Sequence, residues 1–179
     1  KEMLSLNSWI KEAAEWQQPL DEFLIDYNMR ELECSQEDLL AKMQEMLDVM
    51  EKSVEHGLTG ARSHSGLTGG DAKKLAAAAG TEGFVNLLGE KALDAVIYAT
   101  AVGECNAAMG RIVAAPTAGA SGVLPGVFFT LKKHCGLDDA TLQRGMVVAG
   151  SIGMVINERA SLAGAMGGCQ AECGSAAAM

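Results

Sequence analysis

The stretch that decides the fold is residues 35–57, which read SQEDLLAKMQEMLDVMEKSVEHG. Its apolar residues recur every three or four positions, which places them along one face of an α-helix. Ser35 is suited to cap the start of this helix with Asp38 as its capping-box partner, and Gly57 is suited to end it. We interpret the stripe as core packing rather than a partner-binding groove, because methionine commonly fills gaps in cores. The stripe comprises Leu39, Leu40, Met43, Met46, Leu47, Met50 and Val54.

The rest of the chain also predicts helices. They are expected within 1–33 with a break at Pro19, at 72–79 between an Asp71 cap and Gly80, at 92–108, from 127–133 onward, and from Asp138 or Asp139 through Ile156. Residues 160–179 are rich in Ala and Gly and nearly free of charge, so we predict a buried helix there. Aromatic residues make up only 4% of the chain, which disfavours a β-sandwich or barrel. The expected fold is mainly α: a single helical domain with small-residue helix contacts and glycine-rich loops.

The composition excludes several classes of protein. The chain has 179 residues, and its 49% hydrophobic and 21% charged residues exclude intrinsic disorder. The net charge of −9 disfavours binding to nucleic acid or to anionic membranes. Residues 1–62 carry 14 acidic and 6 basic side chains, whereas 63–179 contain 19 of the 21 glycines. We therefore expect an acidic helical segment at 1–62 and a tightly packed body at 63–179.

The sequence also indicates a cellular compartment, through its five cysteines and its apolar runs. The cysteine count is odd, no basic and apolar leader opens the sequence, and the longest nearly apolar run, 145–156, is too short to cross a bilayer. The expected setting is the reducing cytoplasm.

The segment 63–71 predicts a glycine-rich turn that leads into a helix N-terminus. The free N–H groups of such a terminus suit a carboxylate, with Gly69, Gly70 and Lys73 as candidate contacts. A structural turn with solvated lysines is the alternative. His64, between two serines, is a candidate general base, and an exposed loop histidine is its alternative.

Two other segments combine small residues with polar groups. Residues 115–122 offer backbone N–H groups and hydroxyls, so Thr117, Gly119 and Ser121 are candidate ligand contacts; a plain helix connection is the alternative. In 167–174, Cys169 and Cys173 lie four residues apart, on one face of a helix. This pair is either half of a metal site or two buried free thiols.

Three motifs, taken in order, resemble one known family. They are SGLTGGDAKK at 65–74, NAAMGRIVAAPTAG at 106–119 and GGCQAE at 167–172. The chain is identified as similar to the α subunit of the iron–sulfur-dependent L-serine dehydratases of bacteria, over essentially its whole length. The resemblance implies a mainly helical domain, a β domain or β subunit as partner, a homo- or hetero-oligomer, and a role in amino-acid catabolism and gluconeogenesis.

The resemblance also implies a reaction and a cofactor. L-serine would give pyruvate and ammonia through aminoacrylate, with an open iron of a [4Fe-4S] cluster as the Lewis acid on the hydroxyl. Three cysteines would hold the cluster, and Cys169 matches the first of them, whereas the other two lie in motifs downstream of Met179. We therefore expect an N-terminal portion of the α subunit, without an intact cluster and inactive alone. The family's base is sought in a histidine of the β domain, which would make His64 a bystander.

Two other functions remain as alternatives. A noncatalytic helical scaffold could retain the packing of the family without its chemistry. A pyridoxal-phosphate dehydratase would need a Schiff-base lysine in an α/β fold, and Lys73 is poorly placed for that role.

Overall fold

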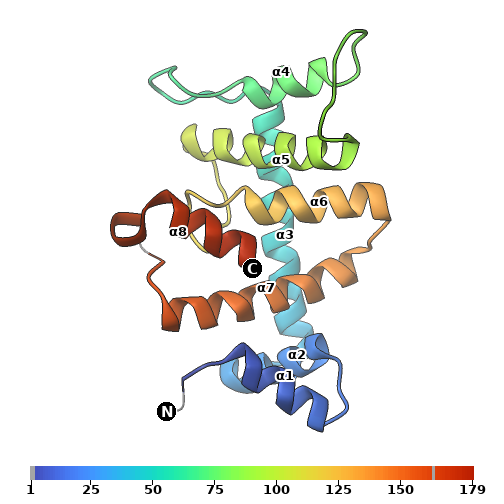
Figure 1. The fold of residues 1–179 in the computed structure, drawn as a ribbon, viewed down its shortest axis with the longest axis vertical. Coiled ribbons are helices and arrows are strands. Elements are labelled where there is room, and N and C mark those ends of the chain that lie inside the picture. The colour runs from blue at the N-terminus through green and yellow to red at the C-terminus, as the bar shows by residue number, and fades with distance from the viewer. Residues whose placement is uncertain (1–2, 163) are drawn as a thin grey trace. The chain divides into compact units, whose positions relative to one another are not determined.

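The computed structural model describes residues 3–162 and 164–179. Within those residues the regular structure is helical, apart from one isolated β-bridge between Arg62 and Gly69, which confirms the predicted mainly α class. The helices, drawn in Figure 1, are α1 (Leu6–Glu15), α2 (Leu20–Leu32), α3 (Gln36–Leu58), α4 (Asp71–Ala78), α5 (Glu90–Ala107), α6 (Val123–Cys135), α7 (Asp139–Arg159) and α8 (Gly164–Ala178). None of these described helices combines the length and the apolar character needed to cross a membrane.

The helices group into two compact units, and the boundary between them falls within α3. Unit 1 comprises Lys1–Met46 and Asp138–Met179, and unit 2 comprises Leu47–Leu137. The predicted start of α3 is confirmed, because the Asp38 amide donates to Ser35 Oγ over 3.1 Å while the Ser35 hydroxyl donates to the Asp38 carboxylate over 2.6 Å. The first of these bonds satisfies one N–H group that the first turn of a helix otherwise leaves free.

The core of unit 1 forms between α1, α2, α7 and the first turns of α3. Its buried apolar residues are Trp9, Ala13, Phe23, Leu24, Ile25, Leu39 and Val147. One polar link crosses this core: the buried Asn28 amide donates to Ser151 Oγ over 3.0 Å. Arg144 binds Asp21 at the edge; burial pulls the pKa of Asp21 upward, but the guanidinium outweighs it and holds that pKa below its usual value.

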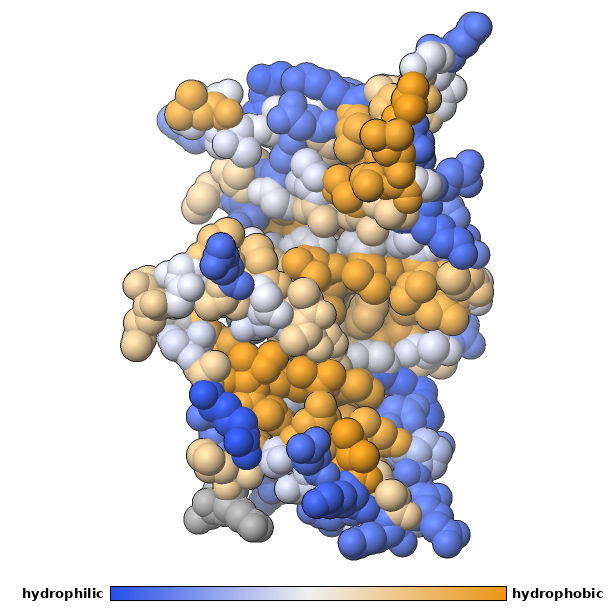
Figure 2. Space-filling model, in the orientation of Figure 1, coloured by the Kyte–Doolittle hydropathy of each residue, from blue (hydrophilic) through white to orange (hydrophobic). Residues whose placement is uncertain are grey.

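Unit 2 stacks α4, α5 and α6 side by side in chain order (Figure 1). The helices approach closely because glycines face the backbone of α5. A Cβ on Gly57 would overlap the Ala101 carbonyl, and one on Gly126 would come within 2.8 Å of the Ala95 carbonyl oxygen. The predicted small-residue helix contacts are therefore confirmed. Figure 2 shows an apolar patch over the segment that leads into α5, where Val85, Leu87 and Leu88 are exposed.

Two predicted helix boundaries in unit 2 are wrong. Helix α3 does not end at Gly57 but continues to Leu58, and the left-handed turn falls at Gly60, whose φ is +94°. Gly57 is instead a contact position. Helix α6 begins at Val123 rather than near 127. Pro125 is tolerated in its first turn because the N–H groups of a first turn have no acceptor within the helix, so the N–H that proline lacks is not needed.

The expected burial of residues 160–179 is also wrong for the described residues. Within α8 only Ala176 is buried, and both cysteines are exposed. Met179 packs toward Gly153 of α7, where an added Cβ would come within 3.0 Å of its side chain. Small side chains bury little apolar area, so a charge-free sequence permits burial but does not drive it.

Candidate functional site

The glycine loop ahead of α4 combines a closing backbone hydrogen bond with two glycines of positive φ. The Ser63 amide donates to the Thr68 carbonyl over 2.8 Å, which closes the loop. Gly69 and Gly70 have φ values of +121° and +86°, and a Cβ on Gly69 would overlap the Ala61 carbonyl. Both glycines are therefore required by the path of the chain. They bring the backbone of the loop to the first residue of α4.

The N-terminus of α4 is capped by Glu104, a residue of α5 that the sequence analysis did not single out. Its Oε1 accepts hydrogen bonds from the Asp71 amide over 2.7 Å and from the Ala72 amide over 3.2 Å. The Asp71 and Ala72 amides at this helix end are thus bound by a carboxyl group of the protein itself. The signal in the sequence is that Glu104 is the one charged residue between Asp94 and Arg111.

Asp71 does not cap α4, contrary to the prediction. It is the first helical residue, and Gly70 occupies the cap position. A hydrogen bond from Lys74, 2.9 Å long, and the charge of that lysine lower the pKa of Asp71. Lys73 folds back instead, and its Nζ donates to the Thr59 carbonyl over 3.3 Å.

The second candidate loop, residues 115–122, is fixed to the same end of α5. Asn106 Nδ2 donates to the Ala118 carbonyl over 3.2 Å, and the buried Ser121 hydroxyl donates to that carbonyl over 2.8 Å. The Thr117 hydroxyl is buried and has no hydrogen-bond partner among the described residues. Gly119 is exposed. This loop therefore presents exposed backbone at Gly119, while the Ser121 hydroxyl is already engaged.

The two loops meet at one structural element. Glu104 holds the start of α4 and Asn106, two residues further on, holds the second loop. Figure 1 shows both loops at the C-terminal end of α5. The structure therefore brings the two predicted groups of contacts to one end of unit 2.

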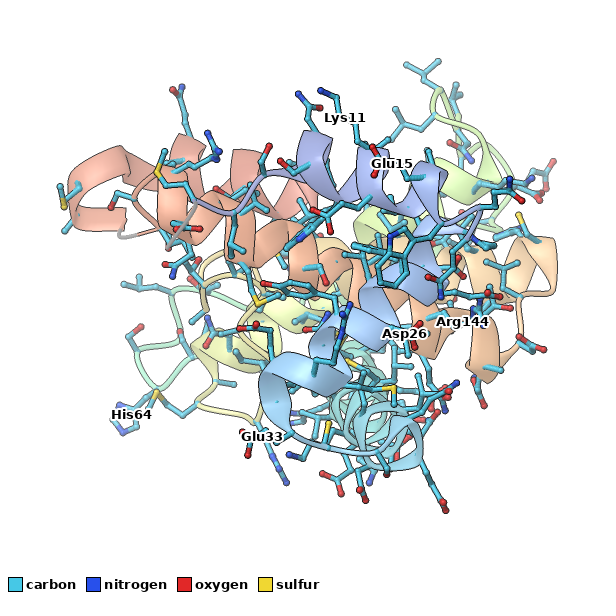
Figure 3. The ribbon with its side chains drawn as sticks, turned by 90° about the horizontal axis from the view of Figure 1, so that it is seen from below. Lys11, Glu15, Asp26, Glu33, His64 and Arg144 are labelled. Atoms are coloured by element: carbon cyan, nitrogen blue, oxygen red, sulfur yellow. The ribbon has the colours of Figure 1, made fainter. Side chains whose placement is uncertain are left out.

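His64 and His56 lie in different surroundings within unit 2. His64 is exposed, and its side chain points away from the fold (Figure 3), as its alternative interpretation predicted. His56 lies in the last turn of α3, and its ring Nδ1 lies 3.3 Å from Cys105 Sγ. Burial raises the pKa of Cys105, so this thiol is protonated at neutral pH. The pair lines a pocket of 230 Å³ together with Val49, Lys52 and Arg111.

A second polar cluster in unit 2 also escaped the sequence analysis. The Asp94 carboxylate of α5 accepts hydrogen bonds from Lys133 Nζ over 2.7 Å and from His134 Nε2 over 2.6 Å. Burial pulls the pKa of Asp94 upward, but these two partners outweigh it and leave that pKa below its usual value. The cluster joins α5 to α6 beside a pocket of 550 Å³.

The cysteine pair of α8 offers part of a metal site. The Sγ atoms of Cys169 and Cys173 lie 3.9 Å apart, and both are exposed, so the buried alternative is wrong. Gly168, with φ +69° and ψ −179°, breaks the helix just before them. Among the described residues, no third His, Cys, Asp or Glu joins the pair to form a metal-binding group. The described donors thus do not match a cluster that is held by three thiolates.

Comparisons with known proteins define the class to which this helical chain belongs. Residues 3–179 match the family described as "Serine dehydratase alpha chain". The chain therefore belongs to the serine dehydratase alpha chain family, as its motifs predicted.

Individual relatives agree with this assignment. The chain is 44% identical over 160 residues to the "Probable L-serine dehydratase, alpha chain" of Bacillus subtilis, covering 89% of this chain and 53% of that protein. It is 35% identical over 159 residues to the "L-serine dehydratase, alpha chain" of Peptoniphilus asaccharolyticus, covering 88% and 54%. It is also 39% identical over 140 residues to an "L-serine dehydratase" of Streptomyces coelicolor, covering 75% and 30%. The chain spans about half the length of the first two relatives.

Proposed function

We propose that this chain carries the substrate-binding loops of an L-serine dehydratase, which converts L-serine to pyruvate and ammonia. Membership of the family supports this proposal, as do the names of its relatives. The observation that carries it is the meeting of the two glycine-rich loops at one end of α5, under Glu104 and Asn106. Backbone N–H groups in such loops suit the carboxylate of a small amino acid.

The reaction requires few contacts from these loops. In L-serine the Cα–H and Cβ–O bonds break, water leaves, and the resulting aminoacrylate is hydrolysed to pyruvate and ammonia. The loops would bind the carboxylate and the ammonium and so hold the Cα–Cβ bond in one orientation. The exposed backbone of Gly119 is the proposed substrate contact in the second loop, whereas the Thr117 hydroxyl is buried and has no hydrogen-bond partner among the described residues.

We also propose that Cys169 supplies one thiolate to an iron–sulfur cluster of the complete enzyme. An iron of that cluster would supply Lewis-acid chemistry when it is bound. Cys169 is exposed and follows the break at Gly168, so its Sγ is accessible to an iron ion that other donors also bind. A β domain or β subunit is the proposed partner, the assembly is a homo- or hetero-oligomer, and the compartment is the cytoplasm.

Cysteine variants of the complete enzyme test the ligand assignment, and the wild-type enzyme assayed beside them tests the reaction. Cys169→Ser should abolish L-serine dehydration and lower the iron content, because a hydroxyl is a far poorer iron ligand than a thiolate. Cys173→Val, the matched control four residues away, should retain most of both. Iron and acid-labile sulfide are measured beside pyruvate formation, so that loss of the cluster is distinguished from loss of folding.

The assignment of Cys169 as a cluster ligand and the proposed reaction can be refuted independently. An active Cys169→Ser enzyme with a full iron content would refute the ligand assignment. A wild-type enzyme that is loaded with iron but forms no pyruvate from L-serine would refute the proposed reaction.

A further inference from the structure

Glu104 is an unusual residue for the interior of unit 2. It lies in the last turns of α5, and only 4% of its surface is exposed. Burying a carboxyl group is costly unless hydrogen bonds satisfy it. One oxygen, Oε1, accepts from two amides of α4, whereas Oε2 is buried without a partner among the described residues. The fold therefore retains a half-satisfied carboxyl group at this position.

The stability of α4 alone does not explain why its cap is a glutamate from another helix. A helix start is ordinarily capped by a Ser, Thr, Asp or Asn at the cap position, where the side chain is partly solvated. Here that position is Gly70, and the cap is supplied from another helix. A local cap would stabilise α4 wherever it lay, whereas a cap from α5 also fixes the start of α4, and the glycine loop before it, to α5.

We propose that Glu104 is a positioning residue for the substrate: it fixes the position of the glycine loop relative to the second loop, which Asn106 holds two residues further along the same helix. This inference rests on the proposed function, because the register matters only if both loops contact one ligand. Loss of the Glu104 bonds would let the first loop move while the second stayed in place.

Hydrogen exchange of the 179-residue chain tests the anchoring. In Glu104→Gln the shape of the side chain is kept but its charge is lost, so the amides of Asp71 and Ala72 lose charge-assisted acceptors. Their exchange should become faster by about tenfold, equivalent to about 1.4 kcal/mol, the difference between a charged and a neutral hydrogen bond. Glu90→Gln is the matched control, since it makes the same change at an exposed position of α5 and should leave these amides unchanged.

Steady-state kinetics of the complete enzyme with L-serine test the positioning role. Glu104→Gln should raise KM by about fivefold or more while kcat changes less than about twofold, because binding contacts are weakened in the ground state and the transition state alike. Asn106→Ala, which releases the other loop, should shift KM in the same direction.

Three results would contradict the inference. Unchanged exchange at Asp71 and Ala72 would show that Glu104 does not anchor the loop. Faster exchange with an unchanged KM would show that the anchor is structural only. A wild-type enzyme that does not act on L-serine would overturn the proposed function itself, and the assignment of Glu104 to substrate positioning with it.

Discussion

The contact between Gly57 of α3 and Ala101 of α5 allows a sharp test of the packing in unit 2. A Cβ at Gly57 would overlap the backbone carbonyl of Ala101. Because the obstacle is backbone, no change of side-chain rotamer can relieve it, and the two helices must separate. Gly57→Ala should therefore destabilise the chain, although alanine favours helices over glycine.

The size of the effect follows from two opposing terms. Overpacking a close contact costs about 1–3 kcal/mol, and the rigid obstacle places this variant at the upper end. Replacing glycine by alanine within a helix gains at most about 1 kcal/mol, and the gain is smaller at Gly57, which lies in the last turn of α3. We expect the free energy of unfolding to fall by about 2 kcal/mol.

Gly103→Ala is the matched control for this test. Gly103 lies within α5, and a Cβ there would meet no atom within 4 Å. This variant should gain about 0.5–1 kcal/mol from helix propensity. Urea unfolding followed by far-ultraviolet circular dichroism measures both, and with a slope of about 2 kcal/mol/M the midpoint of Gly57→Ala should fall by about 1 M. A midpoint for Gly57→Ala at or above that of the wild type, with a raised midpoint for Gly103→Ala, would refute the reasoning.

Variants at two further positions test individual hydrogen-bonded groups. Asp94→Asn should lower the free energy of unfolding by about 1 kcal/mol at neutral pH, because Lys133 and His134 lose a shared carboxylate. Folding lowers the pKa of Asp94, so its contribution to the free energy of unfolding is present above the pKa of the unfolded state and disappears as the pH falls through the pKa of the folded state. If the urea midpoints of Asp94→Asn and the wild type differed equally at neutral and acid pH, this reasoning would be contradicted. Ser35→Ala should cost about 1 kcal/mol by removing the cap of α3, whereas Ser35→Thr should cost less, as thermal unfolding would show.

Much of the fold could be read from local patterns. The stripe from Leu39 to Val54, the Ser35 cap and the Asp138 cap of α7 each act over a few residues, so the sequence contains the information for them. The two glycine loops were identified for the same reason, since glycine and proline restrict the backbone at their own positions.

The sequence by itself determined the helical class, the family motifs and the residues that form the loops, because periodicity, capping and glycine content are local properties. Tertiary structure alone decided that Glu104, 33 residues from Asp71, caps α4, and that Gly57 serves a helix contact rather than a helix end. It also decided that α8 is exposed within the described chain. These outcomes depend on which surfaces meet across long separations in sequence, and a local pattern does not specify its partner.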